Sequence, residues 1–188
     1  VMALTRLGLN QAINLATNTT GTLAVANGGT GLSSGFINGT TNVGKVLQAV
    51  QSKTGTGQSS TSSSFVEYTG GSVSITPSAT SSKVLVMVTG SLFIGRNSIS
   101  QTYGQGRTKL YRGSTDLDIE SSVGHNYGSI SNGTTWADHG FAFSNVGLDS
   151  PNTTSSTTYK IYFKSDGSLQ GYIPFGGKVI FTAMEIAA

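Results

Sequence analysis

The chain has 188 residues, enough to bury one sizeable hydrophobic core, or one core beside an arm that cannot pack alone. Gly, Ser and Thr supply 78 of the residues and charged residues only 10%, a composition that favours strands and turns over helices. The net charge of +3 is scattered without a basic run, which argues against nucleic-acid binding. Cysteine is absent, so neither disulfides nor thiolate metal sites are expected. Such a low charge density is typical of a protein that hides part of its surface in an assembly.

No apolar stretch reaches the roughly 20 residues that cross a bilayer, because polar residues and Gly90 interrupt the longest one, residues 84–94. The first residues also lack the basic-then-apolar order of a secretory signal. We therefore expect a protein that is made in the cytoplasm and neither enters a membrane nor uses this export route.

Residues 1–44 form the first of two regions and carry one charged side chain, Arg6. The Gly- and Thr-rich stretch 17–31 cannot pack a core of its own. The apolar side chains before it have mixed spacing, which allows a short helix that needs a partner surface: Leu4, Leu7, Leu9, Ala12, Ile13 and Leu15. We expect this region to be an extended arm and linker, held by neighbouring chains of a larger assembly.

Residues 45–188 have the pattern of a β domain. The near-continuous apolar run 84–88 predicts a central strand buried on both faces, continued by residues 92–94 after a bulge at Gly90. A turn at Gly113 predicts a hairpin, and residues 52–63 read as a Ser/Thr/Gly loop. The expected strands cover residues 45–51, 65–68, 72–75, 84–94, 108–112, 117–120, 136–143, 159–163 and 179–186. About eight short strands without a βαβ rhythm predict an all-β class, an antiparallel β-sandwich or jelly-roll-like head.

Two patterns imitate catalytic motifs. Residues 31–35 match the Gly-x-Ser-x-Gly nucleophile elbow, but they lie in the Gly-rich arm, away from the strand-to-helix turn that the elbow needs. Residues 39–46 approach a phosphate-binding loop, yet Val46 stands where Ser or Thr must ligate magnesium, and a strand is expected to follow. We interpret both as chance matches in a chain rich in Gly and Ser, and predict no enzyme and no cofactor.

Metal-ligating residue types are sparse, so no metal site is predicted. His125 and His139 lie on separate segments, although one histidine near a three-fold axis would supply three ligands. Asp116, Asp118 and Glu120 share one face of a strand and are alternatives for calcium. We favour a solvated acidic face, paired with basic side chains of the neighbouring strand: Arg107, Lys109 and Arg112.

Residues 21–31, Gly-Thr-Leu-Ala-Val-Ala-Asn-Gly-Gly-Thr-Gly, resemble an element that recurs in bacteriophage tail-fibre and related fibre proteins, with Ala24 where that element more often has Pro. From Gly44 onward, the chain is similar to a head domain of fibres from marine and environmental tailed phages. The stretches that carry this similarity are residues 44–51, 73–77, 81–88, 110–116, 148–151, 157–160 and 182–186.

The resemblance implies a homotrimeric structural protein of the virion surface, with an N-terminal virion-attachment arm (residues 1–44) and a β-rich head (residues 45–188). Its expected partners are itself, other virion proteins bound through the arm, and a host-surface glycan or protein. The arm residues expected to make the attachment are Leu4, Leu7, Leu9, Ile13 and Leu15. The chain is short and lacks a long shaft, which favours a short fibre or spike.

Receptor contacts are expected on loops that carry aromatic and hydrogen-bonding side chains, because aromatic faces stack on sugars and concentrate binding energy. The candidates are Tyr103, Arg107, His125, Tyr127 and Trp136. The alternative is that the aromatic residues fill the core or a contact between copies.

Two other functions stay open. One is a purely architectural capsid decoration or tail adaptor. The other is a glycan-degrading spike, which would need paired carboxylates across a groove; the acids available for it are Glu67, Glu120, Asp138 and Asp149.

Overall fold

A computed structural model describes residues 44–95, 103–126, 139–166 and 169–188 of the chain. The chain divides into two units, Val1–Asn42 and Val43–Ala188, and the described residues all belong to the second. The predicted arm, its short helix and its apolar residues Leu4, Leu7, Leu9, Ile13 and Leu15 lie outside the described residues. The division into an arm and a head therefore stays a prediction.

The described residues form eleven strands and no helix, and they include no helix that could span a membrane. The all-β prediction is confirmed. The strands are β1 (Val46–Thr54), β2 (Gln58–Ser60), β3 (Val66–Glu67), β4 (Val73–Ile75), β5 (Lys83–Gly95), β6 (Tyr103–Arg112), β7 (Thr115–Asn126), β8 (His139–Asp149), β9 (Thr157–Ser165), β10 (Gln170–Ile173) and β11 (Val179–Ile186).

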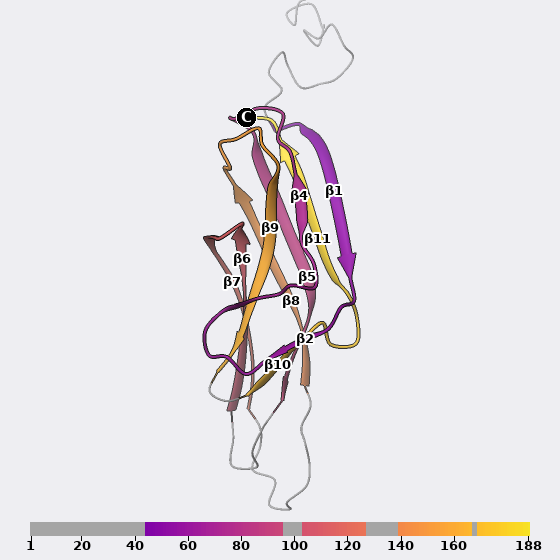
Figure 1. Cartoon of the computed structure of the whole chain (residues 1–188), viewed down its shortest axis with the longest axis vertical. Coiled ribbons are helices and arrows are strands. Elements are labelled where there is room, and N and C mark those ends of the chain that lie inside the picture. The colour runs from indigo at the N-terminus through magenta and orange to yellow at the C-terminus, as the bar shows by residue number, and fades with distance from the viewer. Residues whose placement is uncertain (1–43, 96–102, 127–138, 167–168) are drawn as a thin grey trace, which may run out of the picture. The chain divides into compact units, whose positions relative to one another are not determined.

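Two antiparallel sheets build the head (Figure 1). In sheet A, β5 pairs with β8 along one edge and with β11 and β10, one after the other, along its second edge. The outermost strands on that side are β1, which pairs with β11, and β2, which pairs with β10. In sheet B, β9 pairs with β6 along one edge and with β4 and β3 along its other edge. β7 pairs with the free edge of β6 and completes the sheet.

The strand order is that of a jelly roll. When β1 with β2, β3 with β4, and β10 with β11 each count as one interrupted strand, eight strands remain in two sheets of four. Numbered along the chain, these eight run 1-8-3-6 in sheet A and 2-7-4-5 in sheet B, which is the order of an eight-stranded jelly roll. The predicted β-sandwich head of about eight strands is thus the observed architecture.

Several local predictions were wrong. Residues 52–63 do not form one loop, because β1 runs to Thr54 and β2 follows, and β10 was not predicted at all. Gly90 makes no bulge: the pairing of β5 with β8 keeps one register from Val84 to Ile94. Residues 84–88 are buried on one face only, since Leu85 and Met87 are partly exposed while Val84, Val86 and Val88 face the core. An apolar run can mark a strand with an uncovered apolar face as well as a central one.

The core consists of every second residue of the long strands, as the two-residue period of a strand requires. Tyr159, Ile161 and Phe163 of β9 are fully buried, while Lys160 and Lys164, which alternate with them, are partly exposed, as the sequence pattern predicts. Close approach of the sheets needs glycine at two positions: a Cβ at Gly106 would overlap Ile94, and one at Gly147 would overlap Ile119.

The two ends of the head differ. Gly44, where residues 1–43 join, donates from its N–H to the carbonyl of Ala187 (2.8 Å), so the entry and the C-terminus lie side by side at one end (Figure 1). The opposite end of the head holds the last residues of β5 and β7 and the first residues of β6 and β8. We call these the entry end and the far end.

A carboxylate without a cationic partner is buried at the entry end. Glu185 of β11 is inaccessible to solvent, and no basic side chain of the described residues forms an ion pair with it. Its Oε1 accepts from the N–H (2.7 Å) and hydroxyl (2.6 Å) of Ser78, and its Oε2 accepts from Nε2 of Gln48 (2.6 Å). Burial raises the pKa of Glu185, but these hydrogen bonds and one from Ser82 outweigh it and hold the pKa at about 2.

This cluster stabilises the fold in a pH-dependent way. Because the pKa of Glu185 in the folded state lies below 4.5, its stabilisation is complete above pH 4.5 and is lost as the pH falls toward 2. A lowering from 4.5 to about 2 corresponds to about 3 kcal/mol.

We expect Glu185→Gln to lower the free energy of unfolding at pH 7 by about 2–3 kcal/mol, because an amide cannot accept from all of these donors. Urea denaturation at pH 7 and pH 3 measures it, and the gap between wild type and variant should shrink at pH 3. The matched control is Glu120→Gln, which breaks a partly exposed ion pair and should cost less than about 1 kcal/mol. An equal loss for both variants at pH 7 would contradict this role.

Candidate functional site

The far end brings together two of the predicted contact residues. In the β6–β7 pairing, Gly104 lies opposite His125 and Tyr103 lies opposite Asn126, so the backbones of Tyr103 and His125 are neighbours. Their side chains, and the whole of Tyr127 and Trp136, lie outside the described residues. Arg107 lies four residues along β6 from Tyr103, about 13 Å away at the rise of a strand.

The outer face of sheet B, which we call the charged face, holds eight of the sixteen charged side chains that the structure describes in the head. On β6, β7 and β9, the residues that alternate with core residues point outward onto it. Its members are Phe65, Glu67, Gln105, Arg107, Lys109, Tyr111, Asp116, Asp118, Glu120, Ser122, Lys160, Tyr162 and Lys164.

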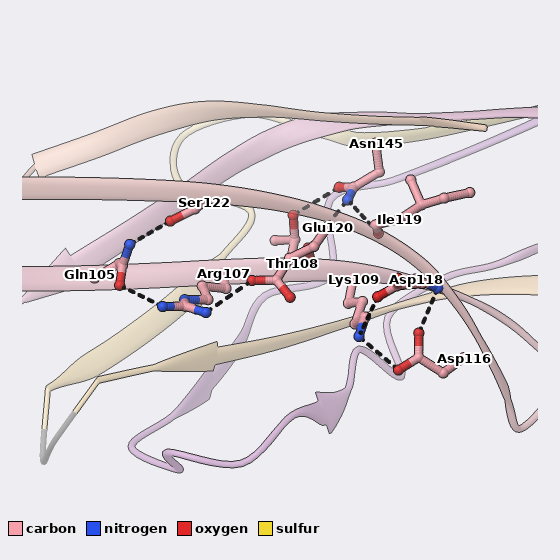
Figure 2. Close-up of polar contacts among 10 residues, drawn as sticks. All are labelled: Gln105, Arg107, Thr108, Lys109, Asp116, Asp118, Ile119, Glu120, Ser122 and Asn145. Atoms are coloured by element: carbon pink, nitrogen blue, oxygen red, sulfur yellow. Dashed lines mark hydrogen bonds and ion pairs between the residues drawn. The ribbon is translucent and has the colours of Figure 1, made fainter.

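Arg107 lies in a row of polar contacts across β6 and β7 (Figure 2). One terminal nitrogen donates to Oε1 of Glu120 (3.3 Å) and the other to Oε1 of Gln105 (3.0 Å), whose own Nε2 donates to Ser122 (2.6 Å). The Nε of Arg107 is buried and has no acceptor in the described part of the chain. Since a guanidinium has five N–H groups, Arg107 keeps donors for an external acceptor, and its side chain is 37% exposed.

Lys109 is held by two aspartates of β7 (Figure 2). Its Nζ lies 2.8 Å from Oδ2 of Asp116 and 3.4 Å from Oδ1 of Asp118. Asp118 has a left-handed backbone (φ 57°) within the irregular pairing next to Leu110, and its N–H donates to Oδ1 of Asp116 (2.8 Å). The hydrogen bond from Lys109 holds the pKa of Asp116 below its usual value.

These contacts resolve the alternatives for the acidic row. The expected pairing with the neighbouring strand is confirmed for Arg107 and Lys109. It is wrong for Arg112, whose terminal nitrogen instead contacts both carboxylate oxygens of Asp149 (2.8 and 2.9 Å). A calcium ion would have to displace the ammonium group of Lys109 from Asp116 and Asp118. In the described part of the chain, no three His, Cys, Asp or Glu side chains gather as a metal site would require.

Aromatic side chains occupy the other half of the charged face. The rings of Tyr111 and Tyr162 lie 4.0 Å apart between centroids. Glu67 accepts from Lys160 (2.7 Å) and from the hydroxyl of Tyr162 (2.9 Å), and the first of these bonds is the main reason its pKa is lowered. The ring of Phe65 lies beneath two ammonium groups, those of Lys109 (5.7 Å) and Lys164 (5.1 Å).

Two carboxylates of this face, Glu67 and Asp116, have lowered pKa values. A glycoside-cleaving pair needs one carboxylic acid whose pKa is raised. The hydrogen bonds from Lys160 to Glu67 and from Lys109 to Asp116 act in the opposite direction and lower the pKa. Flat aromatic rings beside fixed donors and acceptors are, in contrast, typical of surfaces that bind polar ligands.

A buried amide fixes the β6–β7 hairpin to sheet A (Figure 2). Asn145 of β8 crosses between the sheets, where its Oδ1 accepts from the hydroxyl of Thr108 (2.8 Å). Its Nδ2 donates to the carbonyls of Thr108 and Ile119, each at 3.2 Å. Asn145 and Thr108 are almost completely buried, so this one side chain satisfies polar groups that water cannot reach.

A second polar contact between the sheets, at Asp149 of β8, was also not predicted. Its carboxylate accepts from Arg112 of β6 and from the hydroxyl of Tyr159 of β9 (2.8 Å). Burial, and then this hydrogen bond, raise the pKa of Tyr159 far above its usual value. This contact joins three of the stretches that carry the fibre resemblance: residues 110–116, 148–151 and 157–160. The spacing of these stretches along the chain therefore reflects a contact that stabilises the fold.

No family model matches the chain, and none of the curated proteins compared with it matches either. Among solved structures, the chain is similar to the D431N mutant VP2 protein of infectious bursal disease virus, from derived T=1 particles, with 21% sequence identity and a TM-score of 0.26. The match covers 76% of this chain and 37% of the viral protein, so this chain spans little more than a third of that protein's length. At this TM-score the similarity carries no argument about the fold or the function.

We expect Asn145→Ala to lower the free energy of unfolding by about 2–3 kcal/mol, because it leaves buried polar groups of β6 and β7 without a partner. Chemical denaturation measures the loss. The control is Ser144→Ala, an exposed neighbour on the same strand, which should change stability by less than about 0.5 kcal/mol. Equal losses for the two variants would rule out Asn145 as the main polar link between the sheets.

Proposed function

We propose that this chain is a structural protein of a tailed-bacteriophage particle, a short trimeric fibre or spike whose jelly-roll head contacts the host surface. The supporting sequence features are the Gly/Thr-rich element at residues 21–31 and the ordered set of head stretches. The fold is compatible with this role, since jelly rolls occur in viral capsid proteins and in lectins. A fold alone does not assign a function, so the proposal depends on how the head is arranged.

The observation that carries the proposal is that the head has two different ends. The preceding 43 residues join at the entry end, at Gly44, while β6 begins at Tyr103 and β7 ends next to His125 at the far end. An attachment protein needs its anchor and its contact surface at opposite ends. The buried clusters of Glu185 and Asp149 stiffen the entry end, near the start of β5.

The charged face adds a second surface for contact along the side of the head. Arg107, at its centre, keeps guanidinium donors that no described residue uses. Binding through such a face would be weak for a single head, because its charges already pair within the molecule. Three heads per fibre, and several fibres per particle, would convert weak contacts into stable adsorption.

We expect the purified full-length chain to compete with phage particles for adsorption to host cells, because it presents the same heads without the particle. The fraction of particles left unadsorbed at rising concentrations of the chain measures this. Tyr103→Ala should weaken competition at least tenfold, while Ser74→Ala, an exposed change on β4, should leave it unchanged, with circular dichroism to check that both fold.

Labelling the chain on intact particles and imaging them tests its place in the virion. Label at the outer tip of a tail, neck or capsid appendage supports the fibre or spike. Label spread evenly over the capsid, together with a failure to compete, would overturn the attachment role in favour of an architectural decoration.

A further inference from the structure

The outer face of sheet A carries a group of large apolar side chains that nothing in the described head covers. Its large side chains include Val146 and Leu148 of β8, which are 52% and 57% exposed, Leu47 of β1 at 40% and Ile180 of β11 at 37%. Monomeric proteins expose single apolar residues commonly, but seldom expose a broad contiguous group of them. These exposed residues therefore indicate an interaction surface only if they adjoin one another.

The strand register places them side by side. Leu85 of β5 lies opposite Leu148 on one side and Met184 of β11 on the other, and Met184 in turn lies opposite Ala49 of β1. One step along the strands, Met87 lies opposite Val146. Opposite residues of an antiparallel pair lie about 5 Å apart and share one face. An unbroken apolar band thus crosses β8, β5, β11 and β1, which lie side by side in Figure 1. We call it the apolar face.

Charge is nearly absent from this face. The outward positions of the four strands hold two lysines, Lys53 and Lys83, and no acid. They lie toward opposite ends of the face, and Nζ of Lys83 donates to Ser150 (2.8 Å). The charged face across the sandwich carries both signs in abundance. The two outer faces of one sandwich therefore have opposite chemistry.

The size and neutrality of the apolar face fit another copy of this chain. The region where β8, β5, β11 and β1 all lie side by side is about seven residues of β5 long and covers about 450 Å² at ordinary strand spacings. Two such faces would bury about 900 Å², near the roughly 1,000 Å² of the smallest specific interfaces. When three copies turn the same face toward a common axis, equal side chains come close together, so charged residues would repel, whereas a neutral apolar face does not.

We propose that the apolar faces of three copies of this chain turn toward a common axis, pack against one another there and hold the assembled heads together. The inference deepens the proposed function and rests on it for the expectation of several copies. It goes further in naming the surface: β8, β5, β11 and β1 of sheet A, with the charged face of sheet B turned outward.

Sedimentation of the full-length chain with single charge substitutions tests the proposal. The wild-type chain should sediment as an oligomer at micromolar concentration, and Val146→Glu and Leu148→Glu should each weaken association at least tenfold. The matched control is Ser122→Glu, which adds the same charge at an exposed strand position on the charged face and should leave the mass unchanged. Circular dichroism checks that each variant is folded.

The natural absence of cysteine allows a second measurement, because a single introduced thiol is the only one in the chain. Thr89→Cys places it on the apolar face and Ser122→Cys on the charged face, both at exposed positions. A maleimide reagent should label Cys at position 122 at once. It should label Cys at position 89 at least tenfold more slowly in the oligomer, and quickly after Leu148→Glu is added.

The outcomes separate this inference from the proposed function. A monomeric wild-type chain overturns the inference, and if position 89 is still protected, residues 1–43 of the same chain cover the face. An oligomer that tolerates Val146→Glu and Leu148→Glu also overturns it, because the copies then join elsewhere. A monomeric chain would also remove the trimer from the proposed function. Its attachment role is tested separately, by adsorption competition and by the place on the particle.

Discussion

The face-to-face packing of sheet A on sheet B is the constraint on which the rest of the head depends. Each long strand gives alternate residues to the shared core, so the remaining residues must point outward on one of two surfaces. β5 shows the consequence most clearly: Val84, Val86 and Val88 close the core, and Leu85 and Met87 are carried to the outside. The core alone therefore determines which side chains each outer face can present.

The polar side chains buried between the sheets have hydrogen-bond partners for their donor and acceptor atoms. Asn145 is buried but satisfies a hydroxyl and two carbonyls, and Glu185 is buried but accepts from donors on β1 and on the segment before β5. Asp149 gains both a cation and a tyrosine hydroxyl from the opposite sheet. An apolar core tolerates many alignments of two sheets, whereas these directional bonds favour one. They set how β6 and β7 lie on β8, and so the shape of the charged face.

The fold could be predicted from the sequence where the local pattern carries the information. The range of β11 was predicted to the residue, and the hairpin at Gly113 and the alternation along β9 are confirmed. β2 and β10 were missed because they are short and because Gln, Ser and Gly signal turns more often than strands. Their strand geometry comes from pairing with each other and with β5, which no local pattern reports.

The site was predictable to a smaller extent. Cross-strand neighbours in one hairpin can be paired from the sequence, and Arg107 with Glu120 and Lys109 with Asp116 follow from that rule. The cross-strand rule fails for Arg112, because its partner Asp149 is on the other sheet. It also fails for Glu185, whose hydrogen-bond partner Ser78 is 107 residues away along the chain. The apolar face was hidden for another reason: a run of apolar residues in β5 is equally consistent with a strand covered on both sides.

In the proposed attachment protein, the unlike chemistry of the two outer faces would make attachment and assembly depend on each other. On the charged face, Arg107, Lys109 and Lys160 are already paired with carboxylates of the same head, so a ligand must use leftover donors or displace an internal partner. Either way the gain per head is small, since partly exposed ion pairs contribute about 0–1 kcal/mol. Weak contacts hold a particle only when several act at once. If the apolar faces join the heads, burying the uncharged side is what presents several charged faces together, and the binding strength of the assembly then follows from sheet A although the contacts lie on sheet B.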